Sequence, residues 1–177
     1  MRTFLTIALT GAALFCFAGA ALAEDMAKGM TELKASLVDD SGKAVGSATF
    51  RPAEDEGALV SVEVSGLTPG WHGVHMHTTG DCSDHADHFK KAGGHMAEGD
   101  EKHGFLAKDG PHEGDLPNLW VGADGTGKAD YFSEELDLSD LIEGDGTALM
   151  IHAGPDDYKT DPAGNSGDRV ACGVIGK

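Results

Sequence analysis

The chain has 177 residues, a formal net charge of −17 at pH 7, 26 glycines and three cysteines. A charge this negative argues against nucleic acid and anionic membrane surfaces as partners, because both are negatively charged themselves. Glycine is about twice as frequent as its usual ~7%, and Leu and Ala do not recur at helical spacing after residue 23. These features favour an all-β fold with many turns.

The first 23 residues have the features of a secretory signal peptide. Arg2 gives a positively charged n-region, residues 4–21 are apolar, and residues 21–23 (Ala-Leu-Ala) fit the small-residue rule for signal-peptide cleavage. An uncleaved anchor is the alternative, but no stop-transfer segment follows. We therefore predict a cleaved signal peptide over 1–23, a single domain over 24–177, and no membrane association after cleavage.

Two cysteines remain after cleavage, because Cys16 lies within the signal peptide. Exported proteins reach compartments where disulfides persist, so we predict a bond between Cys82 and Cys172, with two unpaired thiols as the alternative. Such a bond would close a loop of about 90 residues and stabilise the fold by roughly 2–4 kcal/mol, chiefly by restricting the unfolded chain.

Short alternating segments predict about eight strands. Residues 59–64 show the pattern most clearly, with Val60, Val62 and Val64 on one face. Residues 123–127 (Ala-Asp-Gly-Thr-Gly) indicate a hairpin, and residues 136–141 fit either a short helical turn or an irregular connection. The other predicted strands are 31–38, 45–50, 70–77, 118–121, 128–132, 147–152 and 170–175. This arrangement is typical of a closed antiparallel barrel or a sandwich.

Residues 80–116 interrupt the strand pattern with a segment rich in Gly, Asp, Lys and His. A loop this long inside a compact domain is usually functional or disordered. Five of the nine histidines lie in it, which favours a function. A second polar loop covers residues 153–168.

The histidines of residues 70–77 point to a metal site. In a strand, His75 and His77 lie on one face, and Val74 and Met76 lie on the other. Two neighbouring imidazoles are poor core residues but suit copper, zinc, iron or nickel. A lone histidine is more often a surface or hydrogen-bonded residue, so it is the grouping of the histidines that indicates a metal site.

Several motifs, in order, resemble those of the copper/zinc superoxide dismutases. Residues 70–77 (GWHGVHMH) are similar to the copper-binding strand of that family, and residues 148–154 (ALMIHAG) to its later copper strand. Residues 93–95, 102–104 and 111–117 resemble the zinc loop, and residues 167–176 the C-terminal signature. The resemblance spans about residues 31–177. It implies an eight-stranded antiparallel Greek-key barrel or sandwich with long metal-binding and electrostatic loops.

The resemblance also implies a set of site residues and two cofactors, copper and zinc. It assigns copper to His75, His77, His95 and His152, and zinc to His95, His103, His112 and Asp115. His95 would bridge the two metals and carry a catalytic proton. Arg169 would dock the substrate, and Asp156 would link the outer nitrogens of His75 and His103.

The implied activity is the dismutation of superoxide to oxygen and hydrogen peroxide. It would proceed by alternate reduction and reoxidation of a histidine-bound copper next to a structural zinc, in a bacterial periplasm. The alternative is a non-catalytic periplasmic copper/zinc binding or delivery protein, against which Arg169 argues, because metal storage needs no anion-docking group. Family members occur as monomers and as homodimers, and the sequence leaves both open.

Three histidines fall outside the implied ligand sets. His72 is expected to be structural and held by hydrogen bonds. His88, which precedes Phe89, is a rival to His95 for the bridging position, but the glycines before His95 and its spacing to the later ligands favour His95. Residues 96–98 (Met-Ala-Glu) depart from the family pattern. His85 and His88 then remain as surface residues or as a weak copper-acquisition patch.

Overall fold

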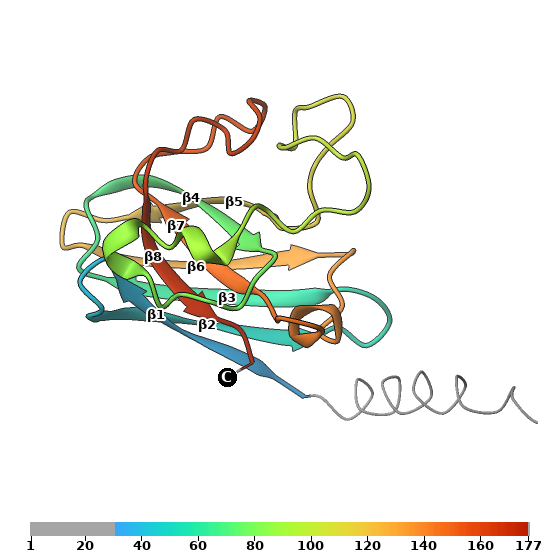
Figure 1. Ribbon diagram of the computed structural model, residues 1–177, viewed down its shortest axis with the longest axis horizontal. Coiled ribbons are helices and arrows are strands. Elements are labelled where there is room, and N and C mark those ends of the chain that lie inside the picture. The colour runs from blue at the N-terminus through green and yellow to red at the C-terminus, as the bar shows by residue number, and fades with distance from the viewer. Residues whose placement is uncertain (1–30, 177) are drawn as a thin grey trace, which may run out of the picture.

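The computed structural model describes residues 31–176, so the predicted signal peptide lies outside the described residues. These residues form eight antiparallel strands in a closed barrel (Figure 1). The strands are β1 (Leu33–Asp39), β2 (Ala44–Pro52), β3 (Ala58–Ser65), β4 (Gly70–His77), β5 (Asp115–Val121), β6 (Thr126–Ser133), β7 (Ala148–His152) and β8 (Arg169–Val174). Within residues 31–176, no helix is both long enough and apolar enough to cross a membrane.

The order of the strands around the barrel is that of a Greek key. It runs β1-β2-β3-β6-β5-β4-β7-β8, and β1 pairs with β8 to close the ring. The consecutive strands β4, β5 and β6 are neighbours, and β3, which precedes them in the chain, lies beside β6 rather than beside β4. The predicted all-β fold with eight antiparallel strands is therefore confirmed.

Alternation along the strands builds the core inside the barrel. In β3, residues Ala58, Val60, Val62 and Val64 are buried, as the sequence predicts for the three valines. In β4, Val74 and Met76 belong to the same core, together with Leu149 and Ile151 of β7. His75 and His77 therefore lie on the outer face of the barrel wall.

Strand β5 begins at Asp115, three residues earlier than the predicted segment 118–121. Pro117 obscured this start, because proline cannot donate to a ladder and argues against a strand in a sequence. The strand forms nonetheless, since Asp115 pairs with His75 and Leu116 pairs with Val74. The ambiguous segment 136–141 leads into a single 3-10 turn, η3 (Asp140–Ile142).

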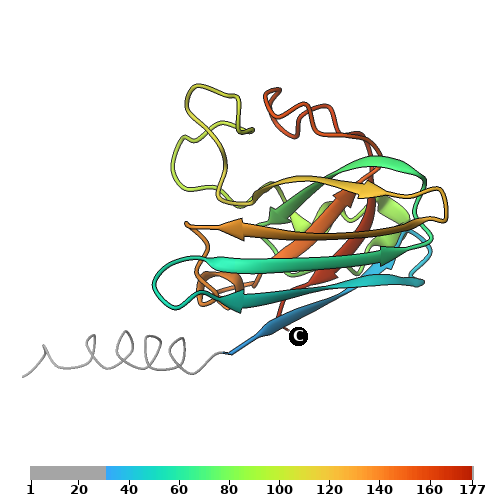
Figure 2. The same ribbon diagram turned by 180° about the vertical axis from the view of Figure 1, so that it is seen from behind.

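The two long loops cover the part of the barrel's outer face that carries His75, His77 and His152 on β4 and β7. Figures 1 and 2 both show the later part of the first loop (yellow-green) and the 153–168 loop (red) rising side by side from one edge. The earlier part of the first loop contains two 3-10 turns, η1 (His85–Asp87) and η2 (Lys90–Ala92). There Phe89 and Ala92 pack against Ala148, Met150 and Cys172 in a second apolar cluster.

The predicted disulfide between Cys82 and Cys172 is present, with the two Cα atoms 5.8 Å apart. Cys172 lies in β8, three residues after Arg169, and Cys82 lies near the start of the first loop. The bond therefore ties this loop to the strand that begins with Arg169.

Candidate metal centre

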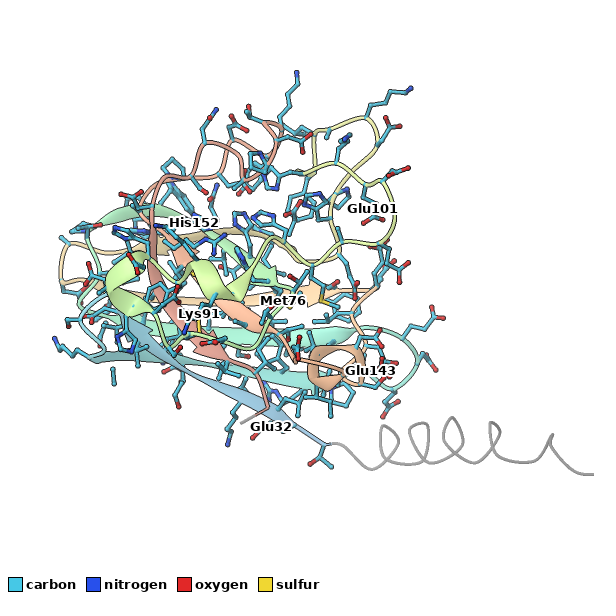
Figure 3. All side chains as sticks on the ribbon, viewed as in Figure 1. Glu32, Met76, Lys91, Glu101, Glu143 and His152 are labelled. Atoms are coloured by element: carbon cyan, nitrogen blue, oxygen red, sulfur yellow. A yellow bond between two sulfur atoms is a disulfide. The ribbon has the colours of Figure 1, made fainter. Side chains whose placement is uncertain are left out.

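Two neighbouring strands bring three histidines together. His75 and His77 are two residues apart on β4, and His152 ends β7. The strands pair so that His75 lies opposite Met150 and His77 lies opposite Ala148. All three histidines are buried. Figure 3 shows His152 near the base of the red loop, where nitrogen atoms of several side chains gather.

The first loop adds His95 to this group. Its backbone forms an isolated bridge with His77, and hydrogen bonds on both sides of it reach the end of β4. The Thr78 N–H donates to the Gly94 carbonyl at 3.0 Å, and the Met96 N–H donates to the Met76 carbonyl at 2.8 Å. The His95 ring thus lies with its centroid 4.1 Å from that of His75.

Four ring nitrogens in this group are buried and have no hydrogen-bond partner within residues 31–176. They are His75 Nδ1 and the Nε2 atoms of His77, His95 and His152. One ligand nitrogen from each of the four rings lies within 4.8 Å of the other three. A buried polar atom without a partner costs about 1–3 kcal/mol, and four in one place indicate a metal-binding site.

The opposite nitrogen of each strand histidine is held by a fixed acceptor. His77 Nδ1–H donates to the Gly93 carbonyl at 3.0 Å, and His152 Nδ1–H donates to the Gly167 carbonyl at 3.0 Å. His75 Nε2–H donates to Asp156 Oδ2 at 2.9 Å. In a neutral imidazole, one donor nitrogen leaves the other with a free lone pair. These contacts therefore turn the lone pairs toward one another, as metal ligation requires.

Burial keeps three of the four imidazoles, those of His77, His95 and His152, neutral at pH 7. It lowers the pKa of His77 to about 2, helped by the nearby Arg169. It also lowers the pKa of His152 to about 3 and that of His95 to about 4. Protons therefore do not compete with a metal ion for these nitrogens at neutral pH.

A second group of potential ligands shares His95. The carboxylate Oδ1 of Asp115 lies 3.0 Å from His95 Nδ1, 2.9 Å from His103 Nδ1 and 3.8 Å from His112 Nδ1. His112 Nδ1 is also 3.4 Å from His95 Nδ1. Three imidazole nitrogens and one carboxylate oxygen are a donor set that zinc accepts in tetrahedral sites.

Hydrogen bonds keep Asp115 ionised in this second group. Burial alone would raise the pKa of Asp115, but the contacts from His103 and His95 and the Gly104 N–H outweigh it and lower the pKa. Burial likewise opposes protonation of His103, but its hydrogen bonds to Asp115 and Asp156 raise its pKa to about 9.

Asp156 connects the two groups through His75 and His103, the two histidines that the resemblance assigns to it. Its Oδ2 accepts from His75 Nε2 and its Oδ1 accepts from His103 Nε2, each at 2.9 Å. The carboxylate is buried, which alone would raise its pKa, but these hydrogen bonds and one from the Tyr158 N–H lower it. An ionised Asp156 therefore fixes one histidine of each group.

Arg169 lies at the edge of the four-histidine group. It is the first residue of β8 and pairs with His152. Its guanidinium donates to the Phe89 carbonyl at 2.8 Å and to the Gly93 carbonyl at 2.7 Å. Since Gly93 also accepts from His77, the cation is fixed beside the histidines while remaining partly exposed.

The remaining histidines join neither group. His72 is buried, and its Nδ1 and Nε2 lie 2.6 Å and 2.8 Å from the carbonyls of His152 and Thr68, as expected for a structural residue. The His85 ring lies near Phe89, with centroids 6.2 Å apart, and His88 is exposed. The structure thus brings His95 rather than His88 between the two groups.

Sequence reasoning missed three contributors to the centre. The Gly93 carbonyl holds two site residues, and Asn118 and Tyr158 bind Asp156. Backbone carbonyls leave no trace in a residue pattern. Asn118 did leave a signal, because it is an amide within a strand that is otherwise largely apolar.

Comparison with known proteins identifies the family. A family model described as copper/zinc superoxide dismutase (SODC) matches residues 44–175. A superoxide dismutase (Cu-Zn) from Caulobacter vibrioides is 43% identical over 141 residues, covering 76% of this chain and 79% of the relative. One from Deinococcus radiodurans is 40% identical over 160 residues, covering 83% and 85%.

Solved structures of similar proteins point to the same family. The crystal structure of a SOD-like protein from Bacillus subtilis has a TM-score of 0.75 and 37% identity, covering 80% of this chain and 96% of that chain. A Cu/Zn superoxide dismutase from Brucella abortus has a TM-score of 0.66 and 30% identity, covering 81% and 98%. The fold, the two histidine groups and these relatives together show that this chain is an enzyme of the copper/zinc superoxide dismutase family, which uses copper and zinc.

Proposed function

We propose that the four-histidine group binds copper, that the group around Asp115 binds zinc, and that the protein dismutates superoxide at the copper. The copper ligands are His75, His77, His95 and His152, and the zinc ligands are His95, His103, His112 and Asp115. The observation that carries the proposal is the convergence of four buried, unpartnered imidazole nitrogens.

The chemistry of the donors supports this division of metals. An all-imidazole site suits copper in both of its common oxidation states, whereas zinc, which has no redox chemistry, accepts three nitrogens and a carboxylate. When bound, copper supplies the one-electron couple by which two superoxide ions and two protons become oxygen and hydrogen peroxide.

His95 is suited to move a proton in this reaction. Its Nδ1 lies 3.0 Å from Asp115 in the zinc group, and its Nε2 faces the copper group without a hydrogen-bond partner among the described residues. The zinc group can therefore hold the ring in place while Nε2 accepts a proton and passes it to the substrate.

Arg169 supplies the positive charge that an anionic substrate needs. Its two hydrogen bonds to loop carbonyls fix the guanidinium beside His77, and Arg stays charged at any working pH. A protein that only binds or delivers copper would not need this group, which favours catalysis over the delivery alternative.

The experiment is to measure superoxide decay by the protein loaded with one copper and one zinc. We expect fast catalytic decay that disappears when copper alone is removed. Tight copper binding without catalytic decay would contradict the proposal and favour a delivery protein.

We further propose that residues 1–23 are a cleaved signal peptide and that the protein works in the periplasm. The disulfide between Cys82 and Cys172 supports export, because disulfides persist in oxidising compartments. Mass spectrometry of the protein from its native host should find a chain that begins at Glu24. A chain that still carries residues 1–23 would contradict cleavage.

A further inference from the structure

Tyr158 contacts three separate parts of the centre, although it is not a metal ligand. Its N–H donates to Asp156 Oδ1 at 2.6 Å, and its hydroxyl accepts from the Asn118 N–H at 2.8 Å. Its carbonyl accepts from the Leu106 N–H at 2.9 Å. Its φ of 62° lies in the left-handed region, which residues other than glycine rarely adopt. These contacts together hold the residue in an uncommon conformation.

Strand β5 offers an N–H to Tyr158 because its ladder is interrupted. The register between β4 and β5 shifts between His72 and Val74, and Pro117 has no N–H to donate. The N–H of the next residue, Asn118, is donated to the Tyr158 hydroxyl instead.

The side chain of Asn118 completes a closed ring of hydrogen bonds. Its Nδ2 donates to the Asp156 carbonyl at 2.9 Å, and its Oδ1 accepts from the Asp156 N–H at 2.8 Å. With the two contacts of Tyr158, four hydrogen bonds join Asn118, Asp156 and Tyr158. This ring fixes both the backbone and the carboxylate of Asp156.

Tyr158 also packs against the segment that carries His103. Gly104 approaches it so closely that a Cβ atom there would lie 2.2 Å from the Tyr158 carbonyl group. The Phe105 and Tyr158 rings meet edge to face, with centroids 5.7 Å apart. The zinc-binding loop and the 153–168 loop are therefore joined at this residue.

We propose that Tyr158 is a positioning residue of the metal centre, which sets the orientation of His75 and His103 through Asn118 and Asp156. The proposal rests on the proposed function, because it assigns His103 to zinc and His75 to copper. Residues that orient ligands in this way typically change metal affinity about 10- to 100-fold when they are replaced.

The test is Tyr158→Phe, which removes only the hydroxyl. Zinc alone is titrated into the metal-free protein against a competing chelator, and Co²⁺ is then bound at the same site to record its visible absorption. We expect zinc to bind about tenfold more weakly or worse, and the Co²⁺ bands to shift because the ligand geometry has changed.

Tyr131→Phe is the matched control. The Tyr131 hydroxyl is buried and has no hydrogen-bond partner among residues 31–176, so its loss should leave zinc affinity and the Co²⁺ spectrum unchanged. Asn118→Ala should weaken zinc binding as Tyr158→Phe does. The double variant should lose less than the sum of the two effects, because both break one ring.

Wild-type zinc affinity and an unchanged Co²⁺ spectrum in Tyr158→Phe would overturn the proposal, even if the variant melted at a lower temperature. A wild-type protein that binds no zinc would instead overturn the proposed function, and this proposal with it.

Discussion

The carbonyl of Gly93 links two residues with different tasks. It accepts from His77 Nδ1–H, which leaves His77 Nε2 free, and it accepts from Arg169, which fixes the cation. One backbone atom therefore sets both the tautomer of His77, a proposed copper ligand, and the position of Arg169, the proposed docking group. At the residue scale, the chemistry of the site depends on the hydrogen bonds that orient the proposed ligands and Arg169, as well as on the ligands themselves.

Replacing Arg169 with alanine should slow superoxide decay without removing copper. A hydrogen bond to a charged group is worth about 1.5–3 kcal/mol, or roughly 10- to 100-fold in rate. Arg169→Lys should lose less, because it keeps the charge but not the two-pronged geometry. The measurement is the decay rate of loaded protein with copper content checked by elemental analysis. Equal rates for the wild-type protein and Arg169→Ala would contradict a docking role.

At the scale of elements, the strands with clear alternation were predictable from the sequence. Strand β4 has the predicted bounds, because residues 74–77 alternate between apolar side chains and histidines and a turn precedes residue 70. The start of β5 was not predictable, since Pro117 hides pairing that only β4 supplies. Motif order suggested the ligands, and the glycines before His95 favoured it over His88. Where the two side chains lie could not be predicted, because a loop without periodicity gives no direction to its side chains.

The disulfide is one of the contacts that hold the first loop against β8. Replacing Cys82 and Cys172 with serine should lower the free energy of unfolding by about 2–4 kcal/mol, because the unfolded chain gains freedom. Urea denaturation of the oxidised wild-type and double-serine proteins measures this difference. Coincident unfolding curves would show that the bond contributes nothing to stability.

At the scale of the molecule, the charge of −17 repels an anionic substrate, while Arg169, the proposed docking group, would attract it locally. Electrostatic steering is a known property of superoxide dismutases. If attraction near the copper dominates, added salt screens it and the decay rate should fall. The measurement is the rate between low and about 0.15 M ionic strength. A rate that rises with salt would mean that the global repulsion dominates.

The pH dependence of stability should change sign near neutrality in the metal-free protein. Burial lowers the pKa of His77 to about 2, of His152 to about 3 and of His95 to about 4. Below about pH 6.5 the unfolded chain binds protons that the folded protein excludes. The free energy of unfolding therefore decreases as the pH is lowered, by up to ~1.4 kcal/mol per pH unit for each histidine.

His103 acts in the opposite direction, because its hydrogen bonds to carboxylates outweigh burial and raise its pKa to about 9. Its stabilising contribution is complete below about pH 6.5 and is lost as the pH rises through 9. Burial raises the pKa of Glu113 to about 7, so protonation of this group stabilises the folded protein as the pH is lowered. This effect opposes that of the three histidines, but it comes from one group against three. Urea denaturation from pH 4 to 9 should therefore show a maximum near pH 6.5, and a stability that rises steadily toward pH 4 would contradict it.

The most direct test of the account is anomalous diffraction at the copper and zinc edges, from crystals of the protein loaded with both metals. We predict a copper signal enclosed by His75 Nδ1 and the Nε2 atoms of His77, His95 and His152, with a separate zinc signal among His103, His112, Asp115 and His95 Nδ1. Copper at the exposed His88, or zinc within the four-histidine group, would contradict the account.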